Sequence, residues 1–328
     1  MTEIFALAGQ NLLSPIILSF ALGLAAALAR SDLSVPEAAA KALSIYLLFA
    51  IGFKGGVAVA AHGVDLTLAL SLLAGFVLSA LLPLVAFGLL RAMTGLSALD
   101  AAAIAAHYGS ISIVTFVAAS SVLDSGGIGY EGYMVAVAAA MEAPAILSAL
   151  WLISRSGGSD GARRMDRDLW REILLNGSIV LLVGAFAIGW ATGEDGLAEI
   201  SSFIVSPFKG VLCLFLLDMG LVAGRGLRQS AGLLQMRVLA FGILMPLVGC
   251  VFGLAAGMLL GLSTGGVALL MVLSASASYI AVPAAMRVAL PEANPALSLT
   301  LSLGVTFPFN LTLGIPLYVA MARAATGG

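Results

Sequence analysis

The chain has 328 residues, of which 61% are hydrophobic and 10% charged, with a net charge of −2. Soluble domains carry about a quarter charged residues, so lipid must solvate most of this chain. The near-neutral charge without a basic face excludes a nucleic-acid-binding protein. Cys213 and Cys250 lie inside apolar runs and are expected to be small buried side chains. No basic leader precedes the first apolar run, which we expect to remain as a span.

Ten apolar runs approach the length of about 20 residues that crosses a bilayer as a helix. They cover residues 12–29, 38–60, 67–90, 99–121, 132–153, 172–192, 204–223, 238–261, 266–289 and 296–322. Charged, Gly-rich or Pro-containing joints at 30–37, 154–172 and 191–202 predict loops. The sequence therefore predicts an all-α integral membrane protein with about ten transmembrane helices.

The basic residues predict how these spans are oriented. With the N-terminus outside, the inside loops receive eleven of the fifteen Lys and Arg residues, as the positive-inside rule requires. These are Arg30, Lys41, Arg91, Arg155, Arg163, Arg164, Arg167, Arg171, Arg225, Arg228 and Arg237. We therefore expect a multi-pass protein of the inner (plasma) membrane with both termini outside.

The fourth predicted span aligns with the ninth without a gap, at an offset of 166 residues. The alignment places Ser110 over Ser276 and Ser112 over Ser278. Further motifs repeat in the same order, so the chain is interpreted as one five-span unit used twice. Because each unit has an odd number of spans, the two must have opposite orientations in the membrane.

This repeat predicts the domain boundaries. Residues 12–154 form the first five-helix repeat, and residues 172–323 form the second, inverted one. Residues 155–171 form a cytoplasmic linker between them.

The serines in spans four and nine predict a binding site near the middle of the membrane. We expect Pro283 to bend or break span nine, and Gly109 to loosen span four. Two half-helices meeting there would aim their positive N-terminal ends at one point, which suits an anion. Serine hydroxyls add donors for an oxyanion and acceptors for Na⁺. The alternative is that these small residues only let helices pack closely.

Ionisable residues inside a membrane are costly and are functional candidates. Lys54 in span two and Asp218 in span seven occupy equivalent repeat positions, and we predict an ion pair between them that ties these helices together. Arg287 is expected at an inner helix end with its guanidinium reaching the interface.

Oxygen-bearing residues in the second half of each repeat predict a sodium site. Glu142 in span five matches Thr306 in span ten, and Asn294 and Asn310 supply amide oxygens. Hard cations prefer such ligands. Alternatively, Glu142 is a helix-end carboxylate with a backbone or basic partner. His107 either contacts substrate or is a buried histidine with protein partners.

Six motifs in order carry a resemblance to a known family. They are VPEA (35–38), IGFKGG (51–56), GSISIVT (109–115), IGYEGY (128–133), APAI (143–146) and the run from SASASYIAVP to LPEANPA (274–296). In order and spacing they resemble the sodium-dependent bicarbonate transporter family, first known from cyanobacteria. The resemblance implies two inverted five-span repeats, two broken helices, a gate domain of spans 1, 2, 6 and 7, a core domain of the other spans, and a homotrimer.

The resemblance also implies where substrate binds, between the two broken spans. The substrate-binding candidates are Gly109, Ser110, Ser112, Thr115, Ser276, Ser278 and Tyr279. The sequence departs from the cyanobacterial pattern at Ile113 and Val114, where that pattern has glycine and serine, and at Tyr279, where it has an acidic residue.

We therefore expect a sodium-coupled symporter that imports bicarbonate or a similar small anion by alternating access. The departures leave open a sodium-coupled transporter of a different small carboxylate. A non-transporting sensor is less favoured, because no soluble output domain is present. No nucleophile–base pair suggests an enzyme, and no organic cofactor is expected. A PII-like regulatory protein is a further expected partner, although the loop at 154–171 is short for its docking.

Overall fold

The computed structural model describes most of the chain. The described residues are 13–63, 65–142, 144–155, 175, 177–229, 235–280, 282–283, 285–286, 290 and 292–327. Most of the predicted linker at 155–171 lies outside them, as does Arg287. Within these ranges every regular element is a helix.

The first half of the chain contains the helices α2 (Pro15–Leu28), α3 (Glu37–His62), α4 (Leu66–Met93), α5 (Ala98–Gly109), α6 (Ile113–Ser125), α7 (Met134–Ala140) and α8 (Pro144–Arg155). Their starts follow ordinary capping chemistry. Ser14 and Asp65 accept hydrogen bonds from the first turns of α2 and α4, satisfying N–H groups that have no partner within the helix.

The second half contains α10 (Gly177–Ile204), α11 (Phe208–Gln229), α12 (Met236–Leu260), α13 (Thr264–Ala275), α15 (Pro295–Leu301), α16 (Phe307–Phe309) and α17 (Ile315–Thr326). Two π-helical turns, Ser302–Thr306 and Asn310–Gly314, join the last three into one continuous helix around Pro308. A proline inside a helix removes one backbone hydrogen bond, and wider turns accommodate that loss.

Eight described helical segments are long and apolar enough to cross a membrane, and two shorter apolar helices, Pro15–Leu28 and Thr264–Ala275, complete the series. All ten coincide with predicted spans, so the chain is a multi-pass membrane protein. The joint predicted at 191–202 is confirmed in part. Most of its residues are helical, but Gly193, with φ +59° and ψ −150°, separates two helical stretches of α10 there.

Two spans contain an extended, non-helical segment deep inside the protein. α5 ends at Gly109 and α6 begins at Ile113, with an extended segment between them. α13 ends at Ala275, and residues 276–280 are not helical. Pro283 lies just after this break, in the first helical residues that follow it, as expected of a residue whose ring clashes with the carbonyl four positions earlier. The first turn of a helix tolerates proline, since its N–H would have no partner there.

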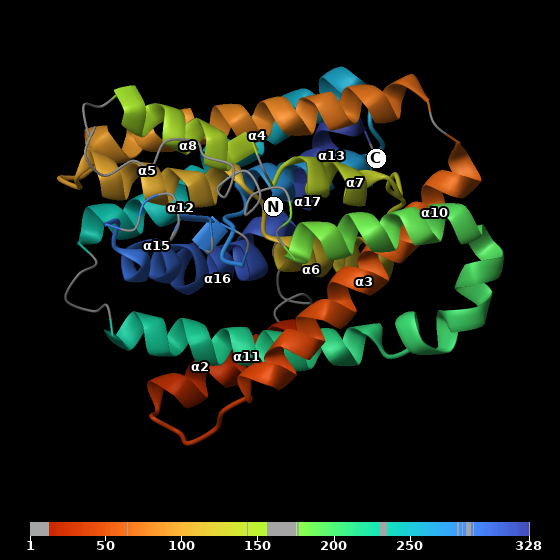
Figure 1. Cartoon of the computed structure of the whole chain (residues 1–328), viewed down its shortest axis with the longest axis horizontal. Helices are drawn as coiled ribbons and strands as arrows, with labels where there is room; N and C mark the ends of the chain where they lie inside the picture. The colour runs from red at the N-terminus through yellow and green to blue at the C-terminus, as the bar shows by residue number, and fades with distance from the viewer. Residues whose placement is uncertain are drawn as a thin grey trace.

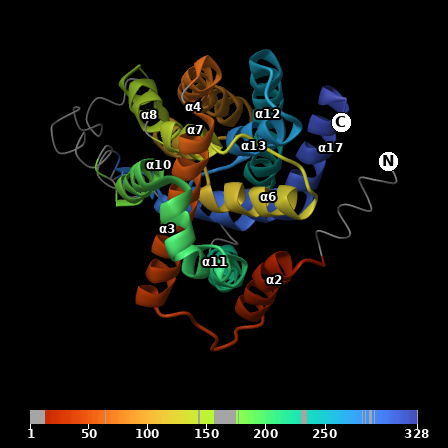
Figure 2. The same ribbon diagram turned by 90° about the vertical axis from the view of Figure 1, so that its right-hand side faces the viewer.

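One group of helices consists of α2, α3, α10 and α11. α3 packs along α10, and α2 packs along α11 (Figures 1 and 2). Glycines permit both approaches: a Cβ on Gly23 would overlap the Leu217 carbonyl, and a Cβ on Gly189 would overlap the Phe53 carbonyl. Small residues allow this close approach of membrane helices.

The second group contains the two broken spans and lies on the other side of the molecule in Figure 2. α5 packs against α4 and α8, while α13 packs against α12 and α17. Gly109 of α5 fits against Pro83 of α4, and Gly249 of α12 fits against Ser274 of α13. Each broken span is thus held by an unbroken neighbour.

Candidate functional site

The two breaks cross and bind each other. Ser112 N–H donates to Ser276 Oγ at 2.9 Å. Ser278 N–H donates to the His107 carbonyl at 2.7 Å, and His107 Nδ1 lies 2.6 Å from the Ser278 carbonyl. Since a carbonyl only accepts, Nδ1 must carry the proton. These bonds satisfy backbone N–H and C=O groups that have no partner within the broken helices. Each such group left without a hydrogen bond in the membrane would cost several kcal/mol of free energy.

The positive end of α6 lies at this crossing. Ser112 is its N-cap, and its Oγ accepts from Thr115 N–H at 3.2 Å and from Thr115 Oγ1 at 2.9 Å. The helix has 13 residues and begins deep inside the protein. Its N-terminal dipole favours negative charge at this point. The structure therefore brings together Gly109, Ser110, Ser112, Thr115, Ser276, Ser278 and Tyr279 at one place.

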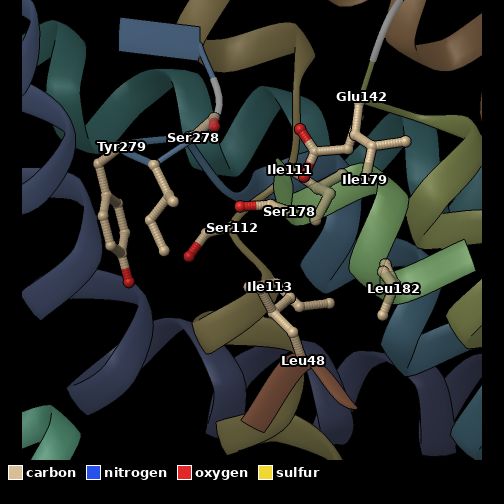
Figure 3. A pocket seen from close by; sticks show the side chains of 11 residues that line it. Leu48, Ile111, Ser112, Ile113, Glu142, Ser178, Ile179, Leu182, Ser278 and Tyr279 are labelled. Carbon is tan, nitrogen blue, oxygen red and sulfur yellow. The ribbon is translucent and has the colours of Figure 1, made fainter. Parts of the chain in front are cut away.

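A small cavity lies beside the crossing, between the two helix groups. Its volume is about 10 Å³, which is room for roughly one water-sized particle. Its polar lining comes from Ser112, Glu142, Ser178, Ser278 and Tyr279, and its remaining walls are Leu and Ile side chains. Figure 3 shows these polar groups arranged around the cavity.

Glu142 places a carboxylate at the cavity. It lies where the helix is interrupted between α7 and α8, and it is only 7% exposed. Ser110 Oγ donates to its Oε2 at 2.6 Å. Ser79 Oγ donates to the neighbouring Met141 carbonyl at 2.6 Å and so holds the interruption in place. Within the described ranges no basic side chain lies within salt-bridge distance of Glu142, so the alternative of a carboxylate with a basic partner is not favoured.

Tyr279 places a buried hydroxyl at the cavity, on the side of Ser112. The side chain is 8% exposed, and its ring packs edge-on against Phe307 with centroids 5.4 Å apart. Its hydroxyl lies on the Ser112 side of the cavity (Figure 3). No group of the described residues meets hydrogen-bond geometry with it. A buried hydroxyl without a partner costs free energy, and a ligand in the cavity would supply one.

The predicted sodium ligands are not gathered around Glu142. Thr306 Oγ1 donates to the Gly242 carbonyl at 2.7 Å and lies 2.6 Å from Tyr108 Oη. Asn310 donates to the Ala275 carbonyl at 2.8 Å and accepts from Tyr318 at 2.8 Å. Both side chains therefore tie the last helix to its neighbours, and none of these bonds reaches Glu142.

Asn294 lies too far from Thr306 for both side chains to bind one sodium ion, so this part of the prediction was wrong. It is exposed and caps α15, with its Oδ1 accepting from Ala296 N–H at 3.1 Å. Twelve residues of helix separate it from Thr306, a rise of about 18 Å. Asn294 N–H instead donates to Asp100 Oδ1 at 3.0 Å, which ties this loop to the start of α5.

The predicted ion pair between Lys54 and Asp218 is absent from the described residues. Lys54 Nζ lies 5.3 Å from the Phe208 ring centroid, a cation–π contact. Asp218 is 6% exposed. The charged side chain that interacts with it is Arg225, further along the same helix. Lys54 therefore meets α11 at Phe208, ten residues before Asp218.

Sequence reasoning missed Ser178. It lies in the first turn of α10, in the other helix group, yet it lines the same cavity as Glu142. The only sequence signal was a hydroxyl near the start of an apolar run, beside Asn176 and Gly177. Such a signal is weak. Ser178 is brought to the cavity only by the packing of α10 against the broken spans.

A wide cleft of about 1420 Å³ leads away from the cavity. The two share Leu48, Ser178, Tyr279 and Ile280. The far end of the cleft is lined by Lys41 and Arg225, among others. The small cavity thus adjoins a wide cleft whose charged lining residues are Glu37, Lys41 and Arg225.

The sequence was compared with known proteins. No curated protein matches it. Residues 15–323, which include both broken spans and every residue of the cavity, match the model of one protein family. Since this match covers nearly the whole chain, the chain belongs to the Na⁺-dependent bicarbonate transporter superfamily.

Proposed function

We propose that the protein is a sodium-coupled symporter that imports bicarbonate or a similar small anion by alternating access. Family membership supports Na⁺-dependent bicarbonate transport. The observation that carries the proposal further is the crossing of two broken helices at a cavity with one carboxylate and several hydroxyls. The superfamily is one of transporters, so no enzymatic reaction is inferred.

The anion is assigned to the N-terminus of α6. Its dipole, the Ser112 hydroxyl and the Tyr279 hydroxyl all favour an oxyanion at this point. Tyr279 is the strongest single pointer, because its buried hydroxyl has no partner among the described residues. Ser276 has a supporting role, since its Oγ already donates to the Leu273 carbonyl and accepts from Ser112 N–H.

The sodium ion is assigned to Glu142 together with hydroxyls that line the same cavity. A buried carboxylate without a basic partner is costly and favours a cation beside it. Ser110 already contacts Glu142, and Ser178 and Ser278 add oxygens to the cavity lining. This set of ligands replaces the predicted sodium site that included Thr306, Asn294 and Asn310. Alternatively, a proton rather than Na⁺ neutralises the charge of Glu142.

Alternating access is supported by the two helix groups. We assign α2, α3, α10 and α11 to a gate domain and the other helices to a core domain. Local geometry supports an inverted repeat: Ser97 and Ser263 are N-caps with the same backbone conformation, and so are Ser110 and Ser276 as C-caps. Both pairs obey the offset of 166 residues. The cleft at Lys41 and Arg225 then corresponds to an inward-open arrangement.

The apolar walls of the cavity favour a second candidate cargo, a small carboxylate whose apolar group would extend into the adjoining cleft, because the cavity alone holds only one water-sized particle. Leu48, Ile111 and Ile113 all line the cavity. Such walls would contact a methyl or methylene group, which bicarbonate lacks. The same sodium coupling would apply.

Reconstitution in liposomes tests the function. Uptake of radiolabelled bicarbonate should require an inward Na⁺ gradient and should fall at least about tenfold in Ser112→Ala with Ser278→Ala. Ser19→Ala is the matched control, because Ser19 Oγ only donates to the Pro15 carbonyl within α2. Uptake driven by a proton gradient without Na⁺ would overturn the sodium assignment. Flux of small carboxylates but not bicarbonate would select the second cargo.

A further inference from the structure

A second cavity lies at the opposite end of α11 from the wide cleft. Its volume is about 450 Å³, within the range of small-molecule sites. α2 and α11 form one wall, and α6, the second π-helical turn and α17 form the other. It therefore bridges the two helix groups at a place that the proposed transport site does not use.

The cavity is amphipathic. Ile17, Val122, Leu311 and Ile315 make its walls apolar. Lys209 lines it as well; its Nζ donates to Ser125 Oγ at 3.2 Å, and among the described residues no carboxylate lies within 4 Å of it. A cation on one side of an apolar chamber suits an anion with an apolar body.

Ser121 is a second, independent pointer to a ligand. It lines this cavity and is only 5% exposed. Its hydroxyl has no hydrogen-bond partner among the described residues. A buried hydroxyl without a partner is unfavourable, and a bound polar group would satisfy it.

Aromatic packing separates this cavity from the proposed transport site. Phe20, one turn along α2 from Ile17, packs edge-on against Phe307 with centroids 5.3 Å apart, and Phe307 packs in the same way against Tyr279. A ligand in the second cavity would therefore lie behind closed packing between α2 and the broken spans.

We propose that this cavity binds a medium-chain amphipathic carboxylate, with its carboxylate at Lys209 and its acyl chain between the two helix groups. Because such a ligand contacts both groups, it stabilises the arrangement in which the opposite cleft is open. It therefore inhibits transport. This last consequence rests on the proposed function, whereas the binding does not.

Cys213 reports on binding directly, since it lines the cavity and is partly exposed. In a Cys250→Ala background it is the only thiol. Decanoate should slow its reaction with methyl methanethiosulfonate in a saturable way, followed by intact-protein mass spectrometry. Lys209→Gln should weaken this protection about tenfold and Ser121→Ala about threefold. Lys41→Gln, which changes a lysine of the opposite cleft, should leave it unchanged.

Decanol is the control for partition of the acyl chain alone. Equal protection by decanol, or unchanged protection in Lys209→Gln, would overturn the carboxylate site. If Cys213 does not react, thermal unfolding decides: decanoate should raise the melting temperature of the unaltered protein more than that of Lys209→Gln. Decanoate that binds without inhibiting Na⁺-driven uptake would refute only the effect on transport.

Discussion

The two broken spans have equivalent serines but different partners. In the first break, Ser110 donates to the Glu142 carboxylate. In the second, Ser276 donates to the backbone of its own helix and accepts from Ser112 N–H. The first break thus contacts a charge, while the second braces its counterpart and presents Tyr279. This difference teaches that serines at matching positions can take different roles: one hydrogen-bonds a carboxylate, and the other braces the opposite break.

Removing the charge at the first break should have the largest effect. Glu142→Gln keeps the shape but loses the negative charge, so Na⁺-driven uptake should fall about a hundredfold, because a hard cation loses its anionic ligand. Uptake in proteoliposomes over a range of Na⁺ concentrations measures this. Glu199→Gln, an exposed site on α10, is the matched control. Normal Na⁺ dependence in Glu142→Gln would refute the cation assignment.

The packing that supports each break can be separated from its chemistry. Gly249→Ala should lower the free energy of unfolding by about 1–3 kcal/mol, because its Cβ would overlap the Ser274 carbonyl. Gly88→Ala in α4 meets open space and should be neutral or stabilise by about 0.5–1 kcal/mol. Thermal unfolding in detergent compares them. Equal stability of the two variants would mean that α12 does not brace the second break.

The matched serines sharpen the comparison further. Ser110→Ala should raise the Na⁺ concentration for half-maximal uptake about tenfold, since it removes the donor to Glu142. Ser276→Ala should instead lower stability by about 1–2 kcal/mol, because Ser112 N–H loses its acceptor. Na⁺ titrations and unfolding curves on both variants distinguish these outcomes. The same change in both would argue that the breaks act alike.

The hydroxyl of the second break should affect only the anion. Tyr279→Phe should raise the KM for bicarbonate about three- to tenfold and change the melting temperature little, since no described residue makes a well-formed hydrogen bond to the hydroxyl. Initial uptake rates at fixed Na⁺ measure the KM. A shift in Na⁺ dependence instead would place the cation, not the anion, beside Tyr279.

The coupling free energy between Lys54 and Asp218 should be the smallest of these effects. Because they are not paired, the effects of Lys54→Gln and Asp218→Asn on unfolding should add to within about 0.5 kcal/mol. A double-mutant cycle by thermal unfolding measures this. A coupling above about 1 kcal/mol would restore the ion pair.

Much of the fold was readable from local sequence. All ten predicted spans correspond to helices, since apolar length alone specifies a helix in lipid. The serines at both breaks were also found, because hydroxyls and glycine interrupt an otherwise apolar pattern. The residues that we propose around sodium could not be found in this way. Asn310 and Thr306 look like ligands in the sequence, yet both make hydrogen bonds that hold helices together.

By itself the sequence determined that the protein is a multi-pass helical membrane protein, which serine-rich segments interrupt two of its spans, and its family. Each of these depends on residues close together in the chain, or on the order of motifs along it. The tertiary structure alone decided which oxygens share a cavity. Ser178 shares a cavity with Glu142 only because α10 packs beside the broken spans. Lys54 misses Asp218 because α3 crosses α11 so that Lys54 lies over Phe208, ten residues before Asp218. Such distances depend on how helices far apart in the sequence pack, and no local pattern encodes them.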